Sequence, residues 1–567
     1  MDNQRLLIWA FFGLTAWMTY QAWVRDYGPQ PQPVPVQSEI EAPGEQASEG
    51  VLPELLDTGD AIDAPSVEPV ADMPAASAPA GAATIQVRTD VLGVTISVRG
   101  GTLTGAILLN FPVAKDRPSE LVELLTTESA RISLIQSGLR GSAEGAEANH
   151  LAMFSGVRES YALDGADEIV VPLTWTDGNG ITVQKRYRLT RGSYTIGLEQ
   201  TVTNNSDAAW RGAEYVQIQR YLASQERSMF DVDSYSFNGP IIYDGEKSEK
   251  LTRDDLVDDG ARSFSSERGW FGSIQHHFVT AVVPEPGTKQ RFSVSARGDR
   301  SVASSIGSPR TVESGTSQIF STTLFVGPKL QSQLEDIDKS LKLTVDYGWL
   351  TIISQPLFWL LSKAFDVFGN WGVAIIAVTV LIKLAFYKLT ESSGRSMAKM
   401  RNLQPRIKAM QERYKDDKQA QSQAMMELYK REKVNPAAGC LPILIQMPFF
   451  LAFYWVLLES VEMRQAPFAL WLTDLSTRDP FFILPLIMGA AMFFQQKLNP
   501  QVGDPVQVKV MQIMPIIFTV FFAFFPSGLV LYWVTNTLLS IAQQWKINKV
   551  VEAESKQEKG GKKTKKE

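Results

Sequence analysis

The sequence predicts a membrane protein of several domains, with six transmembrane helices, a large antiparallel β-sandwich on one side of the membrane and a helical hairpin on the other. Three observations support this fold class. The chain has 567 residues, enough for several domains, and its long apolar blocks lie mainly in the last third. The middle of the chain alternates apolar and polar residues, which is typical of strands. Lys and Arg gather in the segments that this arrangement places on one side of the membrane.

The N-terminal part predicts an anchor and a tether. Residues 1–5 read MDNQR, and the 19 residues of 6–24 are mostly apolar, so as a helix the 19 residues would reach ~28 Å, close to one bilayer core. No small-residue A-x-A-like cleavage site follows closely, which favours an uncleaved anchor over a signal peptide. Residues 25–83 are rich in Pro, Ala and acidic residues. We expect them to form a disordered acidic tether.

Residues 84–340 predict the β-sandwich. Short alternating runs are separated by Gly-rich breaks, the pattern of antiparallel strands. Chemistry-bearing motifs are scarce, because the whole chain has three His and no P-loop, G-x-S-x-G or H-E-x-x-H. His276 and His277 are adjacent, so on a strand they would face opposite sides and could not share a metal. We therefore expect no enzyme activity, cofactor or metal, although plentiful carboxylates leave a glycosidase-like pair open.

The last third predicts an interfacial helix and a membrane core. Residues 345–368 carry an apolar stripe with helical spacing and a polar opposite side. Only two residues separate them from the next apolar stretch, too few to reverse a membrane helix, so we interpret them as an interfacial amphipathic helix. We interpret 371–545 as five spans, because its last apolar block is broken by the turn residues Pro526-Ser527-Gly528.

The charge distribution predicts the topology. The segment 391–439 holds 11 Lys and Arg, whereas 461–479 holds two, and the basic tail 546–567 holds eight Lys. Basic residues favour the cytoplasmic side of a membrane. The sequence therefore predicts cytoplasmic termini and 84–340 outside. Apolar residues spaced by three and four in 391–439, five of them Met, predict a cytoplasmic helical hairpin with its own seam.

Lys383 is the residue of this core that most strongly indicates function. Among the residues of the apolar blocks, Lys383 is the only ionisable one that lies well away from either end of its block. Ionisable residues at such positions in a membrane usually mark a functional interior. The alternative is snorkelling to the headgroups, since Lys388 follows five residues later. Other polar residues fall within the predicted spans and predict a hydrated groove, with ordinary interhelical hydrogen bonding as the alternative. They are Thr379, Gln446, Asn536 and Ser540.

Several long motifs resemble one known family. They read SMAKMRNLQPRIKAMQERYKDDKQ, MMELYKREKVNPAAGCLPILIQMPFFLAFYWVLLESVEMRQAPFAL, DLSTRDPFFILPLIMG and MPIIFTVFFAFFPSGLVLYWVTN. In this order they resemble the YidC-type membrane protein insertases of Gram-negative bacteria. The resemblance implies insertion and chaperoning of nascent membrane proteins in the bacterial inner membrane, with a supersandwich-like domain in the periplasm. The family's outer domain resembles sugar-binding supersandwiches, but we do not infer sugar binding from that resemblance.

The resemblance also implies roles for single residues and partners. The family usually has Arg at the position of Lys383, and Lys keeps the charge without the bidentate fork. Four residues match positions that contact a passing substrate, namely Met447, Phe450, Tyr532 and Trp533. The implied partners are nascent membrane proteins, the Sec translocon, membrane lipids and the ribosome, through the hairpin and the basic tail. No DNA partner is expected.

Two other functions compete with insertion. A transporter or channel would be expected to show charges paired across spans or an internal repeat, and neither is evident. A membrane-anchored envelope polysaccharide enzyme would act through the β-domain, whose sequence is poor in His and in catalytic motifs. The hypothesis of an insertase with a hydrated groove explains Lys383 and the polar residues near it without requiring a catalytic group.

Overall fold

The computed structural model describes residues 53, 83–141, 147–222, 236–414, 417–432, 434, 441–498 and 505–564. The predicted anchor 6–24, nearly all of the tether and the last residues of the tail lie outside the described residues.

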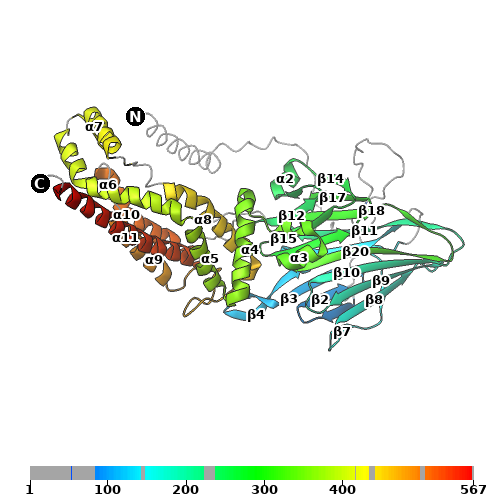
Figure 1. Ribbon diagram of the computed structural model, residues 1–567. Coiled ribbons are helices and arrows are strands. Elements are labelled where there is room, and N and C mark those ends of the chain that lie inside the picture. The colour runs from blue at the N-terminus through cyan, green and yellow to red at the C-terminus, as the bar shows by residue number, and fades with distance from the viewer. Residues whose placement is uncertain are drawn as a thin grey trace, which may run out of the picture. The chain divides into compact units, whose positions relative to one another are not determined.

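The described part of 84–328 forms two β-sheets (Figure 1). The first has the order β14-β17-β18-β11-β5-β3-β2-β1-β7, and β19 and β4 pair with β11 and β3. Its strands are β1 (Thr84–Arg88), β2 (Leu92–Ser97), β3 (Leu103–Ala114), β4 (Arg117–Leu125), β5 (Ser133–Gly141), β7 (Ser160–Ala162), β11 (Trp210–Tyr221), β14 (Arg262–Ser266), β17 (Gln290–Arg297), β18 (Arg300–Gly307) and β19 (Arg310–Val312).

The second sheet has the order β13-β12-β15-β16-β20-β10-β9-β8-β6. Its strands are β6 (Ser155–Gly156), β8 (Glu168–Thr176), β9 (Ile181–Thr190), β10 (Thr195–Asn204), β12 (Asn238–Tyr243), β13 (Ser248–Lys250), β15 (Trp270–Gln275), β16 (Phe278–Pro284) and β20 (Thr316–Pro328). Pairing is antiparallel throughout the two sheets, apart from the parallel pair β1 and β7 among the described strands.

Alternating side chains build the core between the sheets. In β10 every second residue is buried, including Ile196, Leu198 and Val202, because successive side chains of a strand point to opposite faces. Inward-facing aromatic residues such as Trp270 and Phe292 fill the larger spaces. The prediction of a large antiparallel β-sandwich is confirmed.

One local prediction is wrong. His276 and His277 lie in the turn between β15 and β16, and their rings stack with centroids 3.7 Å apart. His276 has a φ of 49°, a left-handed conformation that turns can require. The strand geometry that separates neighbouring side chains therefore does not apply to this pair.

One short helix, α2, lies between β13 and β14, and the other helices follow the sandwich. Their bounds are α2 (Arg253–Asp258), α3 (Gln331–Ile337), α4 (Thr351–Phe368), α5 (Trp371–Ala385), α6 (Tyr387–Arg413), α7 (Lys418–Arg431), α8 (Leu441–Glu459), α9 (Ile483–Leu498), α10 (Pro505–Phe522) and α11 (Ser527–Thr564). Short 3-10 turns occur at Ser129–Arg131, Lys339–Thr344, Gly348–Leu350 and Val461–Met463.

The junction of α4 and α5 is a sharp two-residue turn. Gly369 ends α4 with a φ of 62°, a conformation that glycine adopts without strain. The Asn370 side chain then caps α5 by accepting a hydrogen bond from the Val373 N–H at 3.1 Å. On α4, Leu357 and Leu361 are buried while Trp359 is exposed. The helix therefore has one packed side and an open side that also carries exposed apolar residues, among them Ile352 and Val367.

Helix length gives no direct support for the span count. No single described helix is both long and apolar enough to cross a bilayer, and one bent pair, α5 with α6, meets that condition jointly at an angle of 68°. The prediction of six spans stays a prediction.

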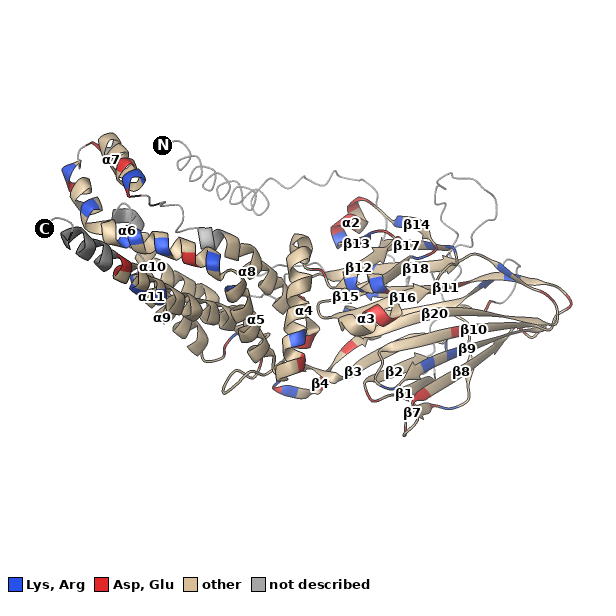
Figure 2. Ribbon diagram, viewed as in Figure 1, with Lys and Arg blue, Asp and Glu red and all other residues tan. Residues whose placement is uncertain are grey.

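Helices α6 and α7 pack against each other as an antiparallel pair. Met400, Leu403, Ile407 and Leu428 form their buried contact. Figure 2 shows charged residues along both helices, whereas α5 and α9 are largely free of them. A narrow apolar seam between charged outer surfaces is the arrangement that lets a small helix pair stay folded in water.

Candidate substrate groove

A small cavity lies among α5, α6, α8 and α11. Its volume is about 30 Å³, which leaves room for about one water molecule. The lining contains one cation, several polar groups and no carboxylate. The lining residues are Thr379, Ile382, Lys383, Phe386, Leu389, Thr390, Ile445, Gln446, Phe449, Tyr532 and Asn536.

Lys383 supplies the charge of this cavity. It lies near the C-terminal end of α5, and its Nζ donates a hydrogen bond to Ser540 Oγ at 2.8 Å. The Ser540 hydroxyl in turn donates to the backbone carbonyl of Asn536 at 2.7 Å. The ammonium is therefore oriented toward α11 by a hydroxyl, which leaves its positive charge uncompensated by any acid of the described lining.

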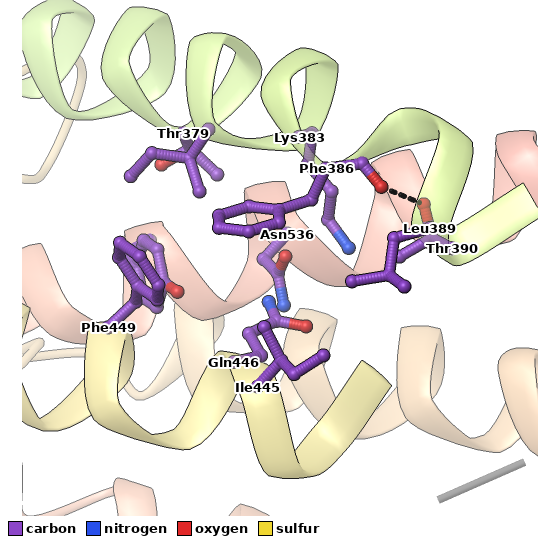
Figure 3. A pocket seen from close by; sticks show the side chains of 11 residues that line it. Thr379, Lys383, Phe386, Leu389, Thr390, Ile445, Gln446, Phe449 and Asn536 are labelled. Atoms are coloured by element: carbon purple, nitrogen blue, oxygen red, sulfur yellow. Dashed lines mark hydrogen bonds between the residues drawn. The ribbon is translucent and has the colours of Figure 1, made fainter. Parts of the chain in front are cut away.

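Polar side chains from three helices meet in front of Lys383. Lys383 from α5, Gln446 from α8 and Asn536 from α11 project into the same space (Figure 3). Tyr532 reaches this group through a side-chain hydrogen bond with Gln446. Amides both donate and accept hydrogen bonds, so this wall can solvate polar segments of either kind.

Thr379 contributes less than its position predicts. It is buried at 1% exposure, and its hydroxyl donates to the carbonyl of Ile375 in its own helix at 2.6 Å. Such back-bonding is a common way for a helical Thr to satisfy its proton. Thr379 lines the upper end of the cavity in Figure 3 without facing the ammonium directly.

The structure adds a polar contact that sequence reasoning missed. Gln543 donates through Nε2 to Thr390 Oγ1 at 2.7 Å and thereby joins α11 to α6. Thr390 lies seven residues after Lys383, two turns along one face of an uninterrupted helix. The seven-residue spacing could have placed Thr390 on the same side as Lys383. The break between α5 and α6, however, means that the two residues do not lie on one continuous helix.

Three of the four residues that match substrate-contacting positions lie inside an aromatic cluster. Phe450 and Trp533 are half-buried and meet edge to face with centroids 4.8 Å apart. Tyr532 is buried and stacks on Phe453 at 4.4 Å. Met447 alone of the four is exposed, at 42%. The aromatic residues thus pack α8 against α11, and Met447 is exposed on the surface of α8.

The outer faces of α9 and α10 are apolar and open. Exposed residues there include Leu486, Phe494, Ile516 and Val520. An exposed apolar surface of this kind marks a contact with membrane or protein. Among the described residues no group of three or more His, Cys, Asp or Glu could hold a metal ion.

Comparison with known proteins decides the family. The model of the YidC periplasmic domain matches residues 84–360, and that of the 60Kd inner membrane protein matches residues 363–555. A membrane protein insertase YidC of Methylococcus capsulatus is 46% identical, with 97% of this chain and 99% of the relative covered. The chain belongs to the YidC family of membrane protein insertases.

Further relatives agree over the full length. The YidC insertase of Nitrosococcus oceani is 45% identical, with 98% of this chain and 100% of the relative covered. A crystal structure of an active YidC insertase with its first transmembrane domain resolved is 21% identical, covers 81% of this chain and 92% of its own, and has a TM-score of 0.38. The β-sandwich is the periplasmic domain of this inner-membrane family.

In this YidC-family chain the periplasmic domain and α8 are joined by a buried ion pair. Lys329, just after β20, places Nζ 2.8 Å from Oε2 of Glu459, the last residue of α8. The two side chains are 1% and 8% exposed. Burial lowers the pKa of Lys329, although Glu459 opposes that shift. Val461, in the turn after α8, is part of the buried core of the periplasmic domain.

Proposed function

We propose that this chain inserts nascent membrane proteins into the inner membrane through the polar cavity, alone or beside the Sec translocon. Lys383 is the main support for this proposal. Its ammonium faces amides and a hydroxyl, and the cavity lining contains no carboxylate. A cation in such a site attracts an acidic or polar segment of a substrate. The hydroxyl and amides can solvate that segment, so it is held weakly and can pass on.

The short helices beside the cavity support a thinned membrane. α9 has 16 residues and α10 has 18, which correspond to ~24 Å and ~27 Å of helix. A hydrocarbon core is ~30 Å thick, and short spans thin the bilayer or draw water inward. The distance that a polar segment must travel through lipid is then reduced.

The exposed apolar surface supports the second step of insertion, in which the apolar segment of the substrate enters the lipid. Once the polar segment has crossed, the following apolar segment needs a surface along which to enter lipid. Met447 is exposed next to the cavity, and its flexible side chain adapts to different partners. Phe450, Tyr532 and Trp533 hold α8 and α11 together behind it.

The topology and the domain organisation form part of this proposal. Both termini are cytoplasmic, with an anchor at 6–24, a tether, the periplasmic domain 84–340, an interfacial helix at 345–368, five spans within 371–545 and a basic tail. The basic hairpin and tail support contact with the ribosome, since phosphate backbones attract Lys and Arg. Labelling from outside should reach a cysteine placed at Asp116 and miss one placed at Gln411; the reverse pattern would contradict the topology.

Reconstitution tests the function directly. The purified chain is placed in liposomes, and a small single-span protein is synthesised in their presence. Insertion is measured as protection of the translocated tail from protease, with empty liposomes as the control. Protection only in the presence of the chain is the expected result. A flux of ions or small solutes without insertion would instead indicate a transporter or channel.

A further inference from the structure

The cavity around Lys383 is too small for a substrate segment. Its volume of about 30 Å³ leaves room for about one water molecule, whereas the backbone atoms of a single residue already take more space. A polar segment therefore reaches the ammonium only after side chains of the lining move apart. The apolar side chains of the lining can move without breaking a hydrogen bond of their own. They are Ile382, Phe386, Leu389, Ile445 and Phe449.

Phe386 and Phe449 are in contact within this lining. Their rings lie edge to face, with centroids 5.2 Å apart and planes at 69°. In Figure 3 the two side chains approach each other, Phe386 from the junction of α5 and α6 and Phe449 from α8. Both residues are partly buried. An edge-to-face contact adds only modestly to the area that two rings bury, so the pair closes the space between the helices and still separates easily.

Phe386 lies where the chain bends from α5 into α6. The two helices make an angle of 68°, and Phe386 has a φ of −92° and a ψ of 10°, outside the regular helical range. Its carbonyl accepts hydrogen bonds from the Thr390 N–H at 3.0 Å and from the Thr390 hydroxyl at 2.9 Å. Gln543 of α11 donates to the same hydroxyl at 2.7 Å. The backbone of Phe386 is thus held in place, and rotation of the side chain alone is enough to move the ring.

Each ring lies close to a polar group of the cavity. Lys383 comes three residues before Phe386 in the sequence, and Gln446 comes three residues before Phe449 within α8. Residues three apart in a helix lie on the same side, about one turn from each other. All four residues line the cavity. Separation of the two rings therefore opens a way to the cation and to the amide together.

We propose that Phe386 and Phe449 form an aromatic gate, which closes the cavity between α5 and α8 until a substrate segment separates the rings. This proposal rests on the function proposed above, because it assigns the regulation of the same cavity. While the gate is closed, the rings keep bulk water and small anions away from Lys383. When a nascent chain enters, its polar segment passes between the rings to the ammonium, and the apolar segment that follows packs against them.

Accessibility of the cavity without substrate tests the closed gate. In the full chain with Cys440→Ser, the substitution Asn536→Cys places a thiol in the lining. A negatively charged methanethiosulfonate reagent is then added to the chain in liposomes. We expect slow modification while both rings are present. Modification should be about two- to tenfold faster in Phe386→Ala and in Phe449→Ala, because loss of one edge-to-face contact shifts an equilibrium by about that factor.

An aromatic pair outside the cavity gives a matched control. Phe493 and Phe494 in α9 also meet edge to face, with centroids 6.4 Å apart, and both are exposed. Phe493→Ala should leave the rate of thiol modification unchanged, and thermal melting shows whether each variant is folded. The proposal is overturned if Phe386→Ala and Phe449→Ala leave that rate unchanged, or if Phe493→Ala raises it as much as they do.

A reversible cross-link tests whether the gate must open. In the Cys440→Ser chain, Phe386→Cys and Phe449→Cys are joined by a short bismaleimide that contains a disulfide. The cross-linked chain should lose most of its insertion of a single-span substrate into liposomes. Reduction leaves the same adducts without the bridge, and it should restore insertion. Full insertion by the cross-linked chain would overturn the proposal, as would failure of the two cysteines to cross-link.

The two assays separate the gate from the function of the cavity. If the reduced chain and the wild type both fail to insert the substrate, the function proposed for the cavity is wrong. The rates of thiol modification are measured without substrate, so in that case they still support or overturn the gate.

Discussion

Lys329→Met should destabilise the junction between the periplasmic domain and α8. The substitution keeps most of the side-chain volume but leaves the Glu459 carboxylate buried, with the 2.8 Å contact gone. Removing one partner of a buried ion pair costs about 3–5 kcal/mol, because the remaining charge stays desolvated without compensation. Replacing both partners by apolar residues is often neutral or stabilising. Lys329→Met combined with Glu459→Leu should therefore recover most of the lost stability.

Pulse proteolysis of the full chain in detergent, across a urea series, measures the free energy of unfolding for each variant. The exposed pair Lys363–Asp366, whose atoms lie 3.1 Å apart at 61% and 60% exposure, provides the control. Lys363→Met should change stability by about 1 kcal/mol at most. The reasoning is refuted if Lys329→Met costs no more than Lys363→Met, or if the double variant is less stable than Lys329→Met alone.

Three further predictions follow from the structure. The pKa of Glu214 is raised by burial from 4.5 to about 7, so its contribution to stability is full below pH ~4.5 and is lost as the pH rises through ~7. Glu214→Gln should remove about 3 kcal/mol of this dependence, and an unchanged slope of unfolding free energy against pH would contradict the assignment. Gly372→Ala should cost about 1–3 kcal/mol, because the new Cβ would lie 2.1 Å from the Phe468 ring; a wild-type melting temperature would show that the ring moves freely. Deleting most of 90–320 should leave insertion into liposomes measurable, because the groove residues lie outside that range, and complete loss in a folded deletion would point to a required role of the periplasmic domain.

Periodicity in the sequence was enough to predict the β-sandwich and part of the groove. Alternation identifies strands because their side chains face two environments. Isolated polar residues within apolar stretches identify the side of a helix that does not face lipid. Lys383, Gln446 and Asn536 were found in this way, and the structure brings them to one cavity.

The same reasoning could not predict contacts that depend on bends, turns or the packing of segments that are distant in the sequence. The bend after α5 hides the relation of Thr390 to Lys383, and the turn that stacks His276 on His277 is not encoded in their spacing. Nor can spacing show that Tyr532 packs into an aromatic interior. A helical pattern gives the faces of one helix, whereas packing is set by which other helix covers each face.

The alternating pattern of β9 does indicate one buried lysine, Lys185. Lys185 occupies the inward phase of β9, between buried Val183 and Tyr187. Its Nζ donates to the carbonyl of Ser137 at 2.7 Å and to that of Gly100 at 2.5 Å. Burial lowers the pKa of Lys185 to about 7. In β9, the Lys in the apolar phase of the strand therefore marks a buried hydrogen-bond site and not a solvated surface.

Insertion by Lys383 variants tests the central claim most directly. Lys383→Arg, Lys383→Ala and Lys383→Glu are reconstituted at equal levels and supplied with two single-span substrates that differ only in whether the translocated tail is acidic or neutral. Because the cation attracts acidic segments into the cavity, Lys383→Arg should retain insertion of the acidic-tailed substrate, and the Ala and Glu variants should lose much of it. The neutral-tailed substrate should be affected less. If Lys383→Ala inserts the acidic-tailed substrate as well as the wild type, Lys383 only snorkels to the headgroups and the groove mechanism is wrong.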